Sequence, residues 1–369
     1  MRLVYLSPVQ WSSFEQRPHK FVRWYHARRQ APVLWVDPYP ARFPRFADLE
    51  KVRKRFANNN PRELPPPWMS VVRPYALPIE PIPGLAHLNR LLWASVVAEV
   101  SRFVGQDDAM IVIGKPSLLA LQIQADFSQH PTMYDAMDDF PSFHKGMAGR
   151  AMSESERQLV SRAGTVWASS RKIHRRLSQQ CNDVQLIPNG LDPTLLPVPR
   201  VRGTTSSPLV FGYVGTMADW FDWEIVVALA LARPQDQVRL IGPLDVRPSM
   251  PLPANIDLRP PLPHALALQA MNTFDVGLIP FKRNLLTDSV DPIKYYEYRA
   301  LGLPVLSTEF GEMANRQNTP GVFLIKVPSD VSEMALRAVA EPADPDPAFI
   351  HDHSWDAIFD AAELRYLHS

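Results

Sequence analysis

The feature that most constrains the fold is the alternation of short apolar runs with longer amphipathic segments. Strands joined by helices in this order are typical of βαβ units, in which the strands run parallel. The first half therefore predicts a doubly wound α/β domain. Its predicted strands are Leu3–Leu6, Val33–Val36, Ala109–Ile113, Thr132–Tyr134, Thr165–Ala168 and Val184–Ile187.

One stretch of the first half departs from this pattern. Between Phe43 and Pro83 charge and proline replace the periodicity, and the stretch includes Pro65-Pro66-Pro67. We expect a long irregular excursion there.

A second α/β series follows a segment rich in proline, serine and threonine at 195–208, which we interpret as a linker. We therefore expect a first domain over 1–194, a second domain over 209–350 and a final helical segment over 351–369. The predicted strands of the second domain are Leu209–Val214, Gln237–Ile241, Val276–Ile279 and Val305–Ser307. Its predicted helices are Trp223–Leu231, His264–Asn272 and Pro292–Leu301, and the final helix is Ser354–Leu367.

Composition excludes several classes of protein. The chain has 369 residues, with 39 Lys plus Arg against 38 Asp plus Glu, so its overall field is weak and general nucleic-acid binding is not expected. The single cysteine, Cys181, excludes an internal disulfide framework and fits a reducing compartment. The apolar run near Leu91–Val100 is shorter than the roughly 20 residues of a membrane span, and the first seven residues are too short for a signal peptide. We expect a cytoplasmic protein.

The segment Asp291–Pro304 predicts an anion site on the second domain. Asp291 can cap a helix whose first residue is Pro292, which places Lys294 in the first turn. Backbone amides, the positive end of the helix dipole and a lysine favour a diphosphate there. Glu297 follows on the same helix face and can accept hydrogen bonds from ribose hydroxyls. The alternative is a surface ion pair between Lys294 and Glu297.

An upstream turn contributes to the same prediction. Gly215, Thr216 and Met217 follow a predicted strand and lead to a helix that Asp222 can cap. Exposed amides of this turn could face the same site, at the carboxyl ends of the strands.

Three carboxylates follow a strand of the first domain, at Asp135, Asp138 and Asp139. Carboxylates that crowd together repel one another, which raises the pKa of at least one of them and can produce a base. In the alternative interpretation Asp138 or Asp139 caps the helix after Pro141.

Two further features stay open. The basic stretch from Gln16 to Arg29 is either a solvated helix face or a patch that approaches anionic lipid, with Trp24 or Tyr25 at the interface. Arg17 and His19 could instead face the active site. Metal ligation has little support, since the acidic pairs Asp107-Asp108 and Asp138-Asp139 lack the arrangement of a strand followed by Asp-x-Asp. We interpret His264, His351 and His353 as surface or cap residues.

The sequence from Asp291 to Val305 resembles the nucleotide-sugar helix of GT-B glycosyltransferases, Pro-x-Lys-x-x-Glu-Tyr-x-Ala-x-Gly-x-Pro-Val. Three further segments resemble this family in the same order, namely Ile187–Asp192, Phe274–Phe281 and Ser354-Trp355. The resemblance implies two Rossmann-like doubly wound domains, with a C-terminal helix that crosses back to the first.

The resemblance also implies roles for particular residues. Lys294 would contact the donor phosphates, Glu297 the ribose, and Gly215, Thr216 and Met217 the nucleotide's edge. Tyr295 belongs to the same donor-binding set. The donor would be a nucleotide-diphosphate sugar, with UDP as the expected nucleotide, and no metal or other cofactor is implied.

The mechanism follows from two comparisons. Retaining members with two glutamates eight residues apart would have a glutamate where this chain has Ser289. The loop at 132–140 resembles that of xanthan-type glucuronosyltransferases, where Tyr-x-Ala-x-Asp carries the base, and their Gly-Ser-Met turn resembles Gly215-Thr216-Met217. This implies inversion with Asp138 as base and Asp135 as an orienting or acceptor-binding group.

The expected function is transfer of a sugar to a glycan or lipid-linked acceptor in bacterial surface polysaccharide synthesis, with peripheral contact at the cytoplasmic face of the inner membrane. The alternatives are a retaining transferase, a nucleotide-sugar epimerase on the same fold and a non-enzymatic two-domain sugar-binding protein.

Overall fold

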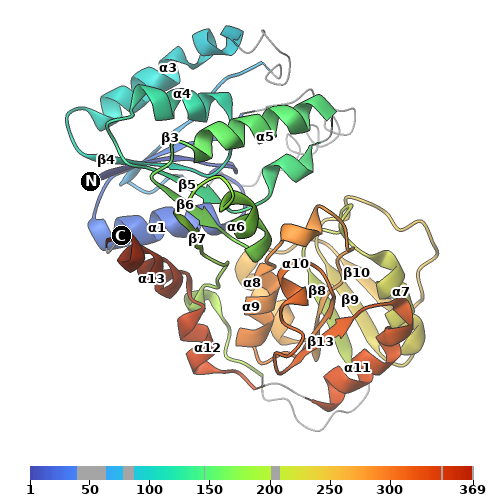
Figure 1. Ribbon diagram of the computed structural model, residues 1–369. Coiled ribbons are helices and arrows are strands. Elements are labelled where there is room, and N and C mark those ends of the chain that lie inside the picture. The colour runs from blue at the N-terminus through green and yellow to red at the C-terminus, as the bar shows by residue number, and fades with distance from the viewer. Residues whose placement is uncertain (40–63, 78–86, 145, 201–207, 342–343, 368–369) are drawn as a thin grey trace. The chain divides into compact units, whose positions relative to one another are not determined.

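The computed structural model describes residues 1–39, 64–77, 87–144, 146–200, 208–341 and 344–367 (Figure 1). Contacts divide the chain into two compact units. Unit 1 comprises Met1–Ser169 and Ile173–Leu186, and unit 2 comprises Ser170–Lys172 and Ile187–Ser369. The division at Leu186 groups Ile187–Asp192 with unit 2, ahead of the boundary expected at position 194. Part of the expected linker, 201–207, lies outside the described residues.

Unit 1 is built on a seven-stranded parallel sheet with the order β3-β2-β1-β4-β5-β6-β7. Its strands are β1 Arg2–Leu6, β2 Val33–Val36, β3 Met69–Val72, β4 Ala109–Ile113, β5 Thr132–Ala136, β6 Thr165–Ala168 and β7 Val184–Leu186. Its helices are α1 Arg17–Arg29, α3 His87–Val104, α4 Leu118–Asp126, η1 Phe140–Phe143, α5 Gly146–Val160 and α6 Arg171–Leu177, the last of which begins within the unit 2 segment.

Helices cover both faces of this sheet, which explains why its strands read as nearly continuous apolar runs. Val4 and Leu6 of β1 belong to the core shared with α3, α4 and α5. Tyr5 points the other way and packs against Phe21 of α1, with ring centroids 5.6 Å apart. Figure 1 shows α3, α4 and α5 together on one face of the sheet and α1 on the other.

Unit 2 repeats this design with a six-stranded parallel sheet in the order β10-β9-β8-β11-β12-β13. Its strands are β8 Val210–Val214, β9 Gln237–Ile241, β10 Ile256–Arg259, β11 Val276–Ile279, β12 Val305–Thr308 and β13 Val322–Ile325. Its helical segments are η2 Pro193–Leu195, α7 Trp223–Ala232, α8 His264–Asn272, η3 Thr287–Ser289, α9 Ile293–Ala300, α10 Gly311–Ala314, η4 Pro328–Asp330, α11 Val331–Ala340, α12 Pro347–Asp352 and α13 Trp355–Leu367.

The strand order reverses once in each sheet, between β1 and β4 in unit 1 and between β8 and β11 in unit 2. Ligands of open α/β sheets bind outside the carboxyl ends of the strands at such a reversal. The predicted fold of two doubly wound α/β domains is confirmed. Whether α13 reaches back to the first domain stays a prediction.

Three strands were not predicted from the sequence. β3 lies within the expected irregular excursion, so that expectation is wrong for Met69–Val72, which pairs in parallel with β2. Residues 43–63 and 78–83 of the expected excursion lie outside the described residues, and the described segments 64–68 and 73–77 contain no helix or strand. β10 and β13 complete the two edges of the unit 2 sheet. Among the described helices, none combines the length and hydropathy of a membrane-crossing segment.

Candidate active site

The helix α9, which carries the predicted phosphate and ribose ligands, is fixed against the sheet by Tyr298. Its hydroxyl donates to the carbonyl of Gly212 and accepts from the amide of Val214, both at 3.3 Å. A Cβ atom at Gly277 of β11 would lie 2.5 Å from the Tyr298 ring, so glycine is needed there. These contacts join α9 to the end of β8, which leads into the turn at Gly215.

Asp291 does not cap this helix, and that prediction is wrong. Pro292 occupies the N-cap position, and the buried Asp291 carboxylate bonds elsewhere. It accepts from the Asn189 amide at 2.9 Å and the Tyr296 hydroxyl at 2.7 Å, and it pairs with Arg316 at 2.8 Å. The side chain thus ties three segments of unit 2 to the loop before α9. Gly302 does end the helix, with a φ of +65°.

Glu297 is the centre of a small charged cluster on α9. One carboxylate oxygen lies 2.8 Å from Lys294 Nζ, and the other lies 2.8 Å from Nε2 of His264. Burial opposes ionisation of Glu297, but the Lys294 ammonium and the hydrogen bond from His264 outweigh it and lower the pKa to about 2. The carboxylate is therefore charged at neutral pH.

This geometry bears on the alternative interpretation of Lys294 and Glu297 as a surface ion pair, whereas donor binding by the two residues stays a prediction. The pair forms, but the Glu297 side chain is only 4% exposed, so it is not a solvated surface pair. The interpretation of His264 as a surface or cap residue is also incomplete. His264 is the first residue of α8, and its ring contacts the carboxylate that the sequence identified.

The turn after β8 differs from the expectation that its amides are exposed. The amide of Gly215 donates to Ile241 at 2.9 Å and that of Met217 donates to Pro243 at 2.8 Å, so both are used within the fold. The turn is close-packed, because a Cβ atom on Gly242 would lie 2.1 Å from the Gly215 carbonyl oxygen. Met217 is buried and Thr216 is half-buried. Donor contacts by Gly215, Thr216 and Met217 stay predictions.

Tyr295 faces the interior of unit 2. The Arg316 guanidinium lies 3.8 Å from the centroid of its ring, and the ring also meets Phe349 edge-on. A donor contact by Tyr295 stays a prediction.

In unit 1, Asp135 forms an ion pair that is completely buried. Arg17 Nε lies 2.9 and 3.1 Å from the two carboxylate oxygens, and Nη2 lies 2.9 Å from one of them. Neither side chain has any exposed surface. The Tyr5 hydroxyl also donates to Asp135, at 3.4 Å. Asp135 is thus held in the interior, where an orienting role fits its contacts better than acceptor binding does.

The Asp139 carboxylate also has partners, but the interpretation of Asp139 as a helix cap holds for its position only, because its side chain makes no capping hydrogen bond to a backbone amide. It precedes η1 at the N-cap position, and its carboxylate accepts from the Ser142 hydroxyl at 2.7 Å. Arg176 lies 3.1 Å from its other oxygen and also pairs with Glu156.

Asp138 differs from both neighbours. It is half-buried, and it makes no hydrogen bond or ion pair with any side chain in the described part of the chain. Burial raises its pKa to about 7; the Arg17 guanidinium opposes this, and Asp135 and Asp139 add to it. Of the three acids, Asp138 is the one whose carboxylate can take up a proton near neutral pH without breaking an ion pair.

The other residues singled out on α1 lie inside unit 1. Nε2 of His19 lies 3.1 Å from the Trp11 carbonyl and Nδ1 accepts from the Gln16 amide at 3.2 Å, which is the pattern of a neutral ring. Burial lowers the pKa of His19 in agreement with this. Trp24 is 5% exposed and packs on Phe21. These positions lend no support to lipid contact by Trp24.

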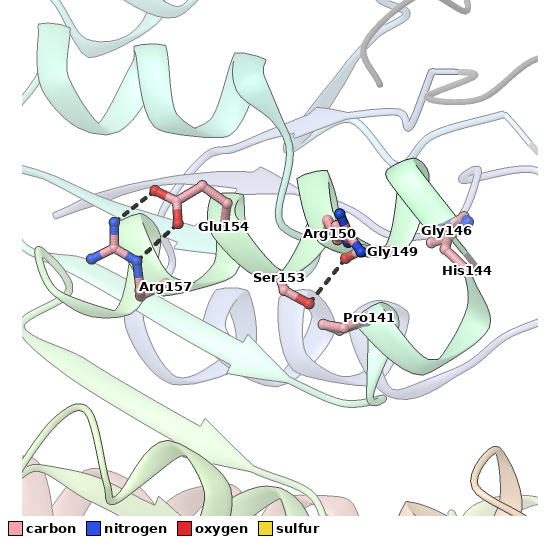
Figure 2. Close-up of a pocket in the computed structure, with 8 residues that line it drawn as sticks. All are labelled: Pro141, His144, Gly146, Gly149, Arg150, Ser153, Glu154 and Arg157. Atoms are coloured by element: carbon pink, nitrogen blue, oxygen red, sulfur yellow. Dashed lines mark hydrogen bonds and ion pairs between the residues drawn. The ribbon is translucent and has the colours of Figure 1, made fainter. Parts of the chain in front are cut away.

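A groove of about 610 Å³ opens between η1 and the first turns of α5, a few residues after Asp138 (Figure 2). Figure 2 shows Glu154 and Arg157 paired along its wall, with Arg150 and His144 nearer the other end. The ion pair of Glu154 and Arg157 measures 2.6 Å. Since the acid and one arginine neutralise each other, we assign no ligand to this groove.

Sequence reasoning missed Arg316 and Arg176, and it missed the contact of His264 with Glu297. Each acts on a residue that is distant in the sequence, and His264 lies 33 positions from Glu297. For His264 the sequence did offer one indication of a role at the donor site. It is the first residue of a predicted helix, and the starts of two other helices of this domain, at Asp291 and after Gly215, were already candidates for that site. Within the described residues, no group of three or more potential metal ligands is found.

No family model matches the chain. A curated relative is a Bacillus subtilis (strain 168) protein, TuaH, whose name assigns it to teichuronic acid biosynthesis as a glycosyltransferase. It is 22% identical over 183 residues, and the match covers 46% of each chain. The match therefore spans about half the length of this relative.

Solved structures resemble the chain over its whole length. Anabaena Alr3699/HepE, solved in complex with UDP-glucose, gives a TM-score of 0.63 at 15% identity and covers 100% of both chains. The lipopolysaccharide outer core galactosyltransferase WaaB, in its apo form, gives a TM-score of 0.61 at 14% identity and covers 99% of this chain and 100% of its own. The chain therefore has the GT-B fold of these glycosyltransferases, and it is similar in sequence to a curated glycosyltransferase over about half its length.

Proposed function

We propose that the protein transfers a sugar from a nucleotide-diphosphate donor to a glycan or lipid-linked acceptor in surface polysaccharide synthesis. The observation that carries this is the buried, ionised Glu297 with Lys294 beside it, on a helix next to the strand reversal of unit 2. A carboxylate and an ammonium at this spacing suit a ribose and a diphosphate. The UDP-glucose held by HepE supports a UDP-sugar donor, and the name of TuaH supports glycosyl transfer in the synthesis of a surface polymer.

For the chemical step we propose inversion with Asp138 as general base. Asp138 takes the proton of the acceptor hydroxyl while the hydroxyl oxygen bonds to the anomeric carbon. The bond from that carbon to the diphosphate oxygen breaks, and the nucleoside diphosphate leaves with the bonding electrons. Lys294 offsets the charge that develops on the diphosphate. No metal ion takes part in this proposal.

The surroundings of Ser289 support inversion over retention. Ser289 is buried in η3, where the two-glutamate pattern would place a carboxylate. The adjacent Asp288 is paired with Lys172 at 2.6 Å. Transfer with retention on the same fold is the second candidate, and epimerisation of the donor is a third.

Thermal-shift titration of the full chain with UDP, GDP, dTDP and CMP tests the donor site, because a ligand that binds the folded state raises the melting temperature by mass action. We expect stabilisation by a nucleoside diphosphate. Absence of a shift with all four nucleotides contradicts the proposal. Conversion of a UDP-sugar without any acceptor would identify an epimerase instead.

NMR of the product tests the stereochemistry. Inversion predicts that the anomeric configuration of the product is opposite to that of the donor. A retained configuration would rule out the role proposed for Asp138 and leave the donor site untouched.

A further inference from the structure

The carboxylate of Glu297 has two partners, Lys294 and His264. Under the proposed function, donor binding would draw Lys294 away and leave His264 in place. One oxygen lies 2.8 Å from Lys294 Nζ and the other lies 2.8 Å from His264 Nε2. Because a carboxylate only accepts, Nε2 of His264 must carry a hydrogen and donate it. Both oxygens are thus satisfied by side chains of unit 2.

Donor binding would weaken only the contact of Glu297 with Lys294. Lys294 is 23% exposed and sits in the first turn of α9, where a diphosphate would draw its ammonium away from Glu297. The carboxylate itself is buried and loses the cation that most lowers its pKa. A buried carboxylate that loses a partner is costly unless other donors hold it.

His264 can supply such a donor, because the fold holds its ring in place. It is the first residue of α8, a helix whose Ala267, Leu268 and Met271 are buried in the core that also contains Tyr295 and Tyr296 of α9. Nδ1 of His264 is buried from solvent and has no hydrogen-bond partner in the described part of the chain. The hydrogen bond from Nε2 to Glu297 is therefore the polar contact that orients the ring.

We propose, on the basis of the function proposed above, that His264 is a positioning residue for the donor ribose. It holds one oxygen of Glu297, which keeps the carboxylate oriented toward the ribose hydroxyls after Lys294 moves to the diphosphate. His264 acts through Glu297 and does not itself touch the reacting atoms.

The test compares the affinities of UDP and 2′,3′-dideoxy-UDP for the full chain by calorimetry. The ratio of the two affinities isolates the ribose contacts, whereas general damage to the fold weakens both ligands alike. For the wild type we expect a preference for UDP of about 10–100-fold, the range of one or two charge-assisted hydrogen bonds. Glu297→Gln should reduce this ratio to a few-fold, and this sets the lower reference.

His264→Leu should reduce the ratio toward that of Glu297→Gln. His264→Gln should restore it, because the glutamine amide can place an N–H near the position of Nε2. His264→Asn is the matched control, since the same amide is then one methylene too short. This pair keeps the test decisive even if His264→Leu does not fold.

The inference is overturned if His264→Asn keeps the wild-type ratio while Glu297→Gln loses it. The inference is also overturned if His264→Gln and His264→Asn lower the ratio of the two affinities equally. If the wild type binds none of UDP, GDP, dTDP and CMP, the proposed function itself fails and the inference fails with it. If only GDP binds, GDP and 2′,3′-dideoxy-GDP take the place of the uridine pair.

Discussion

Asp138, the proposed base, also lowers the free energy of unfolding at neutral and higher pH. A carboxyl whose pKa is about 7 in the folded protein and near 3.8 in the unfolded chain binds more protons when folded. Its contribution to the free energy of unfolding therefore falls as the pH rises from about 4 to 7, and it stays low above pH 7.

Asp138→Asn should therefore stabilise the protein at pH 8, by on the order of 2–4 kcal/mol, and have little effect at pH 4. Denaturant unfolding at the two pH values measures this. The same variant should lose about 10²–10⁴-fold in turnover while it still binds the nucleoside diphosphate. Full turnover in Asp138→Asn would remove the residue from the mechanism.

The pH profile gives an independent check on the base. Since Asp138 must be ionised to accept a proton, kcat/KM should rise with pH and level off above an apparent pKa near 7. Initial rates of nucleoside diphosphate release from pH 5 to 9 measure the profile. A flat profile across this range would contradict the assignment.

Lys294→Ala should weaken binding of the nucleoside diphosphate by about 1.5–3 kcal/mol, because one charge-assisted hydrogen bond to phosphate is lost. Calorimetric titration with UDP measures the change. Arg150→Ala, in the groove of unit 1, is the control and should leave this affinity as it is. Equal affinity in Lys294→Ala and the wild type would place the lysine outside the site.

At the level of elements, the start of α9 depends on the buried pair of Asp291 and Arg316. Arg316→Met removes one partner and leaves a buried carboxylate with fewer donors, which should cost about 3–5 kcal/mol of stability. Chemical denaturation of the full chain measures this loss. Arg157→Ala, which breaks an exposed pair on α5, is the control and should unfold at the wild-type midpoint. Identical midpoints for the two variants would show that Asp291 does not need its cation.

The sequence predicted most of the elements because burial on both faces leaves a strong apolar signal. Val33–Val36 and Ala109–Ile113 were predicted with the observed bounds for this reason. β10 was missed because Ile256–Arg259 lies at an edge, where its four residues are half-buried or exposed and alternate between apolar and charged, so no continuous apolar run marks the strand. α9 was placed to within a residue at each end, but its N-cap was not, because Asp291 found buried partners as far away as Asn189.

For the whole molecule, the two-domain α/β architecture followed from the order of strands and helices, whereas the selection among the acids required the folded structure. Asp135 and Asp139 have the same local signals as Asp138, and only their pairing with Arg17 and Arg176 separates the three. The likeness to the GT-B fold extends over the whole chain, so the architecture rests on more than the motif at Lys294 and Glu297.

The pairing of Arg17 with Asp135 also constrains the order of events during synthesis. The two residues are 118 positions apart, and both are completely buried. While the chain emerges from the ribosome, α1 is available long before β5, but docking it on the sheet would bury a guanidinium without its carboxylate. The α1 face of unit 1 should therefore close only once Asp135 has emerged, which leaves the apolar side of α1 open to chaperones until then.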